Sequence, residues 1–201
     1  MARQIVLATH NPGKVREVAE ILQVAGPASA VVLVSAGQMG VRPPVEDGVT
    51  FQQNALIKAW AACRETGLAA LAEDSGLCVS VLGGAPGVFS ARWAGCHGND
   101  QANLELLLDQ LADVPDQHRS AWYECAAVLV LPSGQEHEAT GRMPGRLARV
   151  AKGDGGFGYD PIFIPESMSV TAAQLSPEQK NAISHRGQAL RALAPHLLAL
   201  V

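Results

Sequence analysis

The chain has 201 residues, of which 48% are hydrophobic and 17% charged, and its formal net charge is −4. This length and hydrophobic content suffice to bury a core, which excludes an intrinsically disordered chain. The slight negative balance argues against a protein that coats nucleic acid, although a local cluster of Lys and Arg can still bind a small anion.

The cysteines and the hydrophobic runs predict the cellular compartment of the protein. The four cysteines form no Cys-x-x-Cys pair and no zinc-finger spacing with His, which predicts free, mostly buried thiols in a reducing cytoplasm. No signal h-region follows Met1, and no uncharged hydrophobic run reaches about 18 residues. We therefore expect a cytoplasmic protein without a membrane or nucleic-acid partner.

The first half of the chain alternates strand-like and helical segments. Short hydrophobic runs predict strands at residues 5–8, 31–34, 68–72 and 77–82. Hydrophobic residues at helical spacing predict helices at 15–25 and 50–66. Thr50-x-x-Gln53 resembles a capping box for the second helix, and Gly67 would end it.

The second half continues the alternation after a loop rich in Gly and Pro at 83–98. A leucine-rich pattern predicts a helix at 100–112, and a later pattern predicts one at 177–198, interrupted by Gly187. Strands are expected at 121–131, 136–141 and 145–150. With no linker or repeat, the pattern predicts one α/β domain over 1–201, built on a mixed sheet.

The turn from Thr9 to Lys14 joins a predicted buried strand to a helix. Amides at a helix N-terminus and the helix dipole favour a phosphate, and Lys14 lies where a cation opposes the dipole unless an anion is nearby. The alternative is an ordinary Asn-Pro-Gly turn with a solvated lysine.

Two acidic segments form a second candidate site. Glu46-Asp47-Gly48 lies in a loop, and Glu73-Asp74-Ser75-Gly76 lies between two hydrophobic runs, so that its carboxylates would be at a sheet edge. Such carboxylates can converge on magnesium together with phosphate oxygens, or can be a helix-entry pair and a polar hairpin turn. On the helix between them, Asn54 and Lys58 share one face and could meet a polyphosphate.

The third candidate is a pair of C-terminal segments. Gly155–Phe163 carries three glycines, two aromatics and a carboxylate; it could stack on a flat ring and hydrogen-bond its edge, or be a glycine-rich hairpin capping the core. Lys180 and Ser184-His185-Arg186 offer donors for a carbonyl oxygen such as that at position 6 of an oxidised purine. The alternative is the polar face of an amphipathic helix.

Together these segments resemble the inosine triphosphate pyrophosphatase family, the non-canonical purine (dITP/XTP) pyrophosphatases. The resemblance is specific because the motifs occur in family order over residues 5 to about 190. They are Ala8–Lys14, Glu46–Phe51 with Asn54-Ala55 and Lys58-Ala59, Glu73–Leu77, Gly84–Gly87, Ser90–Trp93, Gly155–Phe163, Lys180 and Ser184–Gly187.

The resemblance implies a house-cleaning hydrolase that cleaves ITP, dITP or XTP between the α- and β-phosphates, giving the monophosphate and pyrophosphate. It implies a magnesium cofactor, with manganese as an alternative, and a small-molecule purine nucleotide as the partner. It also implies a long mixed sheet flanked by helices, with two lobes around a deep active-site cleft, in a homodimer.

By position in the motifs, the resemblance assigns Asp74 as proton acceptor and, with Glu46, as metal ligand. Phe157 would stack on the base. The other substrate-binding residues would be Thr9, His10, Asn11, Pro12, Gly13, Lys14, Asn54, Lys58, Ser75, Gly158, Tyr159, Asp160, Lys180, His185 and Arg186. His10 occupies a place often taken by a small residue in the family, which leaves its contact open.

The residue chemistry is consistent with that reaction, because phosphoryl transfer needs neutralised oxygens and a positioned water more than a covalent nucleophile. No Ser or Cys has an evident base partner. Two other functions remain: a nucleotide sensor without catalysis, which would not need both Glu46 and Asp74, and a pyrophosphatase for modified pyrimidines, which Ser184-His185-Arg186 does not favour.

Overall fold

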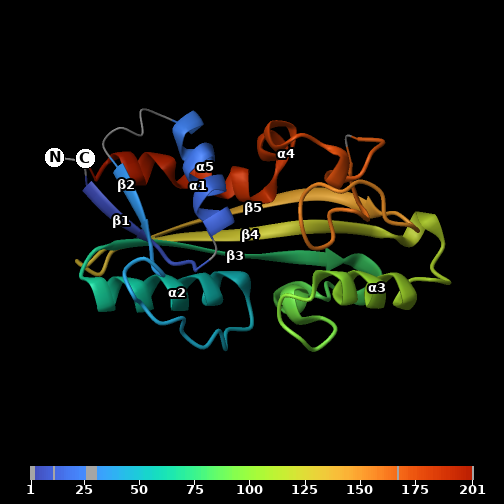
Figure 1. Ribbon diagram of the computed structural model, residues 1–201, viewed down its shortest axis with the longest axis horizontal. Coiled ribbons are helices and arrows are strands. Elements are labelled where there is room, and N and C mark those ends of the chain that lie inside the picture. The colour runs from blue at the N-terminus through green and yellow to red at the C-terminus, as the bar shows by residue number, and fades with distance from the viewer. Residues whose placement is uncertain (1–2, 11, 26–30, 167, 201) are drawn as a thin grey trace. The chain divides into compact units, whose positions relative to one another are not determined.

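The computed structural model describes residues 3–10, 12–25, 31–166 and 168–200. Its six strands form one sheet in the order β2-β1-β3-β4-β5-β6 (Figure 1). The strands are β1 (Arg3–Leu7), β2 (Val31–Ser35), β3 (Ala69–Val79), β4 (Ser120–Val130), β5 (Glu136–Leu147) and β6 (Phe163–Pro165). β1 pairs in parallel with β2 and β3, whereas β5 and β6 are antiparallel. The mixed sheet confirms the predicted α/β fold.

The α-helices are α1 (Pro12–Ala25), α2 (Phe51–Thr66), α3 (Asp100–Gln110), α4 (Pro177–Ile183) and α5 (His185–Leu198). Short 3₁₀ turns lie at Ser80–Leu82, Gly87–Arg92, Asp116–His118 and Ala172–Gln174. Within the described ranges, no helix combines the length and hydrophobicity needed to cross a bilayer. All four cysteines are free and only Cys96 is exposed, which confirms the prediction that the thiols are unpaired and mostly buried.

The chain divides into two compact units. The first contains the residues up to Asp74, Cys125–Gly141 and the residues from Arg186 on; the second contains Ser75–Glu124 and Arg142–His185. Strands β3, β4 and β5 contribute residues to both units. The cleft that the family resemblance implies stays a prediction.

The first unit is layered. Alternate residues of a strand point to opposite faces of the sheet, and two separate cores result. One core joins Leu71 of β3 to α1 and α5 through residues such as Val18 and Leu190, and the other joins Ala70 and Ala72 to α2. Figure 1 shows α1 and α5 on one face of this part of the sheet and α2 on the other.

The second unit has a core of its own, which includes Leu77, Leu107, Tyr159 and Phe163. Arg119, only 1% exposed, donates hydrogen bonds to three backbone carbonyls at its margin, those of Leu111, Leu147 and Ala148. A buried guanidinium requires such partners, since an unpaired buried charge is costly.

The acidic segment Glu73–Gly76 was predicted to separate two strands and to lie at a sheet edge, and this prediction is wrong. β3 runs through it without a turn, and in the strand order β3 lies between β1 and β4, inside the sheet. The carboxylates are tolerated there because each has a cationic partner, described below. Residues 80–82, predicted as strand, form a 3₁₀ turn.

Two other boundaries also differ from the predictions. The expected strands at 136–141 and 145–150 are one strand, β5, because its end pairs with β6 from Gly145 to Leu147. The expected helix at 177–198 is two helices, because Ser184 is extended (φ −64°, ψ 148°) and its amide caps α4 on the Lys180 carbonyl. Gly187, the predicted interruption, lies inside α5.

Candidate active site

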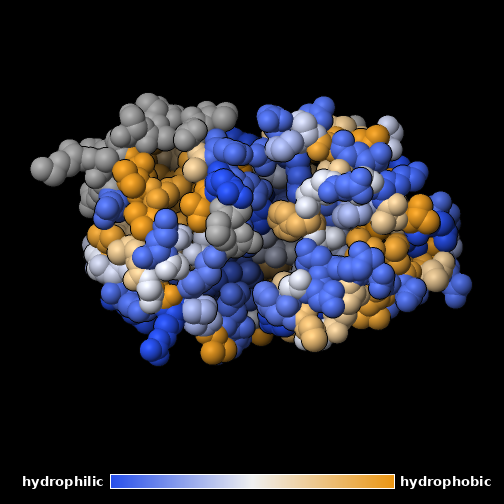
Figure 2. All heavy atoms as spheres, in the orientation of Figure 1, coloured by the Kyte–Doolittle hydropathy of each residue, from blue (hydrophilic) through white to orange (hydrophobic). Residues whose placement is uncertain are grey.

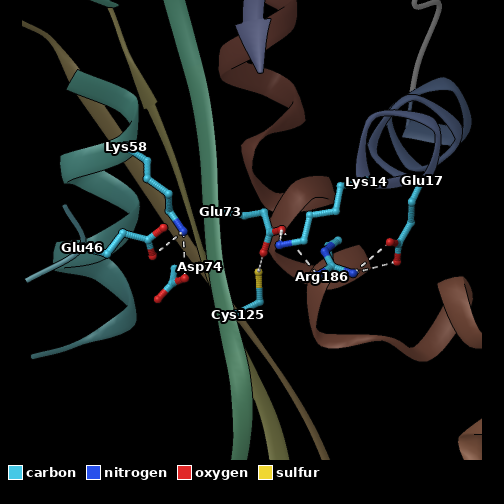
Figure 3. Close-up of polar contacts among 8 residues, drawn as sticks. All are labelled: Lys14, Glu17, Glu46, Lys58, Glu73, Asp74, Cys125 and Arg186. Atoms are coloured by element: carbon cyan, nitrogen blue, oxygen red, sulfur yellow. Dashed lines mark hydrogen bonds and ion pairs between the residues drawn. The ribbon is translucent and has the colours of Figure 1, made fainter. Parts of the chain in front are cut away.

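Glu73 and Asp74 are consecutive in β3, so their side chains point to opposite faces of the strand. Both side chains are largely buried, with 5% of Glu73 and 15% of Asp74 exposed. Figure 3 shows Asp74 on the side of α2 and Glu73 on the side of α1 and α5. The acidic motif therefore supplies one carboxylate to each of two charged clusters.

The cluster on the α2 side brings together four of the predicted site residues. Lys58 Nζ donates to Asp74 Oδ1 at 2.8 Å and to Glu46 Oε2 at 3.1 Å (Figure 3). Asn54 Nδ2 donates to Asp74 Oδ2 at 3.3 Å. Glu46 and Asp74 therefore contact the same ammonium, whereas their role as metal ligands stays a prediction.

Local sequence explains how α2 and the preceding loop build this cluster. Asn54 and Lys58 are one helical turn apart and face the same way. Thr50 caps α2 by accepting from the Gln53 amide, but Gln53 Oε1 accepts from the Val49 amide, so the predicted capping box is only half formed. The Gly48 amide donates to Asn54 Oδ1 at 2.9 Å, and a Cβ at Gly48 would lie 2.6 Å from that oxygen.

The electrostatics of the cluster favour a cation between the acids. Burial raises the pKa of Asp74, Lys58 opposes that rise, and the neighbouring Glu46 and Glu73 carboxylates add to it. Burial lowers the pKa of Lys58, but the surrounding carboxylates, Asp74 foremost, outweigh burial and raise it. A second positive charge, in addition to that of Lys58, would therefore stabilise the ionised form of Asp74 further.

The donor set also fits a divalent ion completed by substrate. Magnesium commonly uses one or two carboxylates together with phosphate oxygens and water, and Glu46 and Asp74 supply two. Within the described part of the chain, no group of three or more His, Cys, Asp or Glu side chains is placed to hold a metal by itself. A metal here would need oxygens from the nucleotide.

The cluster on the other face of β3 contains Lys14 and Arg186 from the predicted set, together with Glu73. Lys14 Nζ lies 2.7 Å from Glu73 Oε1, and Arg186 Nη2 lies 3.4 Å from the same oxygen. Arg186 Nη1 donates to both carboxylate oxygens of Glu17 at 2.9 Å. Cys125 Sγ lies 3.8 Å from Glu73 Oε2.

Sequence reasoning missed Glu17 in this cluster. Its spacing gave a usable signal, because Glu17 lies three residues after Lys14 in a helical pattern and so shares its helix face. Glu73 explains why Lys14 is tolerated at the start of α1, because its carboxylate is the nearby anion that offsets the repulsion by the helix dipole. Burial alone would raise the pKa of Glu73, but Arg186, Lys14 and Lys58 hold it well below its usual range.

The turn before α1 is only partly described. The Thr9 amide donates to the Leu7 carbonyl at 2.7 Å, and His10 Nε2 lies 2.8 Å from the Val41 carbonyl oxygen. α1 begins at Pro12, a favoured residue type at that position, and continues through Gly13. Asn11 lies outside the described residues.

In the second unit, Asp160 organises the glycine-rich segment. This carboxylate is 2% exposed and accepts from the Phe157 amide at 2.9 Å and from Lys180 Nζ. Gly156 adopts φ +72°, and a Cβ there would lie 2.1 Å from Asp160 Oδ2. The Gly158 amide donates to Asp100 Oδ2 at 2.9 Å. The segment is therefore a fixed loop rather than a hairpin.

The two aromatics of this loop have different environments. Tyr159 is 4% exposed and donates its hydroxyl to the Ser90 carbonyl at 2.9 Å, so it anchors the loop in the core. Phe157 is 53% exposed, and Lys180 Nζ lies 4.6 Å from its ring centroid. Phe157 thus offers ring surface for stacking, with a cation beside it.

The remaining predicted residues are Ser75 and His185, which also belong to the second unit. Ser75 follows Asp74 in β3. His185 is 6% exposed and its ring stacks on Tyr123, with centroids 4.8 Å apart and planes at 8°. Their proposed contacts with a nucleotide stay predictions.

Comparisons with known proteins show which proteins the chain resembles. The model of a family described as the Ham1 family matches residues 5–196. A dITP/XTP pyrophosphatase of Leifsonia xyli subsp. xyli is 56% identical over 98% of this chain and 96% of its own. A HAM1 protein structure from Coxiella burnetii has a TM-score of 0.89 at 41% identity, covering 98% of this chain and 99% of its own. A structure from Mycobacterium abscessus, named as a nucleoside-triphosphatase/dITP/XTP pyrophosphatase, has a TM-score of 0.79 at 49% identity. The match covers 96% of this chain and 99% of that one.

Proposed function

Because the chain belongs to the Ham1 family, we propose that it hydrolyses non-canonical purine nucleoside triphosphates (ITP, dITP and XTP) to the monophosphate and pyrophosphate. The dITP/XTP pyrophosphatase named above, at 56% identity, supports this substrate class. The observation that carries the proposal is the convergence of Glu46, Asp74 and Lys58, since two carboxylates around one cation suit a metal-assisted reaction on phosphate.

Magnesium is the proposed cofactor, with manganese as the alternative. Glu46 and Asp74 would hold the ion, which would neutralise the charge that builds up on the phosphate oxygens. Asn54 would keep Asp74 in place, because its side-chain NH₂ donates to the Asp74 carboxylate while its side-chain oxygen accepts from the Gly48 amide in the loop that carries Glu46.

The protein's own groups would do the rest of the work at the triphosphate. The Asp74 carboxylate would accept a proton from the attacking water. Lys58 and Lys14 would pair with phosphate oxygens, and the amides at the start of α1 would add the positive end of the helix dipole. Ser75 and the turn from Thr9 would complete the contacts. Cleavage at the α–β bond then releases pyrophosphate.

The purine would be recognised by stacking and by donors at its edge. Phe157 has the exposed ring for stacking, and Gly158, Tyr159 and Asp160 fix its loop. Lys180, His185 and Arg186 are the proposed donors to a 6-keto oxygen. The 6-amino group of adenine would meet these donors with another donor, and a buried mismatch of this kind lowers reactivity strongly.

The test is the identity of the product. Purified protein is incubated with ITP, with and without magnesium, and pyrophosphate, orthophosphate and the nucleotide product are quantified separately. We expect IMP and pyrophosphate in equal amounts, and no reaction after chelation of the metal. IDP and orthophosphate would instead place the cut at the γ-phosphate and refute the proposal.

The resemblance also implies a homodimer working in the cytoplasm, which we keep as part of the proposal. Sedimentation velocity at two protein concentrations would measure the mass. A mass equal to one chain at both concentrations would contradict the dimer.

A further inference from the structure

Four charged side chains of alternating sign form a continuous series on the α1 and α5 side of β3. Lys14 Nζ contacts Glu73 at 2.7 Å, Arg186 contacts the same oxygen of Glu73 at 3.4 Å, and Arg186 also contacts both oxygens of Glu17 at 2.9 Å (Figure 3). Lys14 and Glu17 come from α1, Glu73 from β3 and Arg186 from the start of α5. The series thus ties three elements together.

Burial is greatest in the middle of this series, at Glu73 and Arg186, and the Glu17 side chain at its end is 19% exposed. The Lys14 side chain is 31% exposed, whereas those of Glu73 and Arg186 are 5% and 3% exposed. Buried ions are tolerated only when paired, and breaking one pair leaves its partner uncompensated. Glu73 is therefore held firmly by Arg186 and can in turn fix the position of the more exposed Lys14 ammonium.

This arrangement matters because a lysine side chain is flexible. Lys14 opens α1, where the helix dipole repels a cation, and its long side chain can turn toward solvent at little cost. The Glu73 carboxylate offsets that repulsion and selects one orientation. Since the turn preceding Lys14 is the proposed phosphate site, the orientation of Lys14 decides whether its charge reaches the triphosphate.

We infer that Glu73 is a positioning residue that holds Lys14 for the triphosphate, and that Glu17 supports it through Arg186. The inference rests on the proposed function for the phosphate contact of Lys14. It assigns Glu73 a role separate from that of its neighbour Asp74, which faces α2.

The first test uses no nucleotide. The native chain is labelled with a limiting amine reagent, and modification of Lys14 is measured by mass spectrometry relative to the exposed Lys152. Without its carboxylate partner, Lys14 in Glu73→Gln should react about threefold faster or more. Glu17→Gln should give a smaller increase. Glu20→Gln, an exposed change of the same kind on α1, is the control and should match the wild type.

The second test is a double-mutant cycle on ITP hydrolysis, read as pyrophosphate release. Glu73→Gln should lower kcat/KM roughly 10- to 100-fold, because a charged hydrogen bond that orients Lys14 is lost. In a Lys14→Met background the same change should cost less than about threefold, since Glu73 would then have nothing to position. Glu17→Gln should lower kcat/KM by a smaller factor, and this loss should also shrink in the Lys14→Met background. This variant replaces Glu73→Gln in the cycle if Glu73→Gln does not fold.

The outcomes separate the inference from the proposed function. Equal losses from Glu73→Gln with and without Lys14 would overturn the positioning role, as would unchanged Lys14 labelling in both Glu73→Gln and Glu17→Gln. A wild-type chain that released no pyrophosphate from ITP would refute the proposed function and, with it, the phosphate role of Lys14. The labelling test would still decide whether Glu73 holds that lysine.

Discussion

Glu73 and Asp74 show how one residue step in a strand separates two roles. Asp74 meets Lys58 and Glu46 on one face of β3, while Glu73 meets Lys14 and Arg186 on the other. The sequence indicated both acids, but it predicted a break between two strands at this point, with the carboxylates at a sheet edge. Only a continuous strand sends them to different partners.

Asp74→Asn should fold and lose most turnover. The substitution keeps the shape and removes the charge that would accept the proton and hold the metal, so kcat for ITP should fall about 100-fold or more. Glu65→Gln, an exposed change on α2, is the matched control and should keep wild-type kcat. Near-normal turnover in Asp74→Asn would remove Asp74 from the mechanism.

Arg186→Ala should destabilise the fold. The truncation leaves the Glu73 and Glu17 carboxylates without their shared cation, and loss of one partner from a buried ion pair costs about 3–5 kcal/mol. Arg16→Ala, at an exposed site on α1, should change stability by less than about 0.5 kcal/mol. Urea unfolding measures both free energies. A change at Arg186 as small as that at Arg16 would mean that the pairs contribute no stability.

At the scale of elements, hydrophobic pattern and local signals predicted most helices and strands. The end of α2 at Gly67, the span of α3 and the strand β4 match the predictions within a few residues. The pattern failed where pairing or capping decided the outcome. β5 is continuous because β6, too short to be recognised, pairs with its end, and the break between α4 and α5 rests on one extended residue, Ser184.

The glycine-rich loop was recognised from its composition, but the contacts that hold it in place were not. Sequence could not show that Asp160 is buried beneath the loop and accepts from both the Phe157 amide and Lys180, because these contacts join residues up to 20 positions apart. Nor could it show which aromatic stays exposed. The structure assigns Tyr159 to the core and leaves Phe157 at the surface.

Two glycines of this loop allow a matched test. Gly156 and Gly158 both have positive φ (72° and 61°), but only at Gly156 would a Cβ meet Asp160, at 2.1 Å from Oδ2. Gly158→Ala should cost about 1 kcal/mol of backbone strain, whereas Gly156→Ala should cost about 2 kcal/mol or more and raise KM for ITP. Urea unfolding and steady-state kinetics measure these effects. Equal effects of both changes would mean that Asp160 does not brace the loop.

At the scale of the whole molecule, Figure 2 shows how hydrophilic and hydrophobic residues are distributed on one face. On the face drawn in Figure 2, hydrophobic residues lie in small groups among hydrophilic ones. Some exposed hydrophobic side chains flank the candidate site in sequence, such as Val45 and Val49 at 81% and 78% exposure on either side of Glu46. The boundaries of the two units could not be read from the sequence, because strands β3 to β5 pass through both.

Folding should protect three of the four thiols. Burial raises the pKa of Cys63 and Cys125 and that of Cys78 to about 11, so few of these thiols ionise near neutral pH. Cys96 is exposed. Brief alkylation of the native protein at pH 7.5 should modify Cys96 alone, and alkylation in denaturant should modify all four. Mass spectrometry that found Cys125 labelled early would contradict its burial in the sheet.

The most direct test of the account is a nucleotide panel scored by kcat/KM for pyrophosphate release with magnesium. If donors read a 6-keto oxygen while the Glu46–Lys58–Asp74 cluster acts on the triphosphate, ITP, dITP and XTP should exceed ATP by about 10²- to 10⁴-fold. In Asp74→Asn, all four substrates should lose activity together. Equal kcat/KM for ITP and ATP would contradict the assignment of a keto-purine substrate.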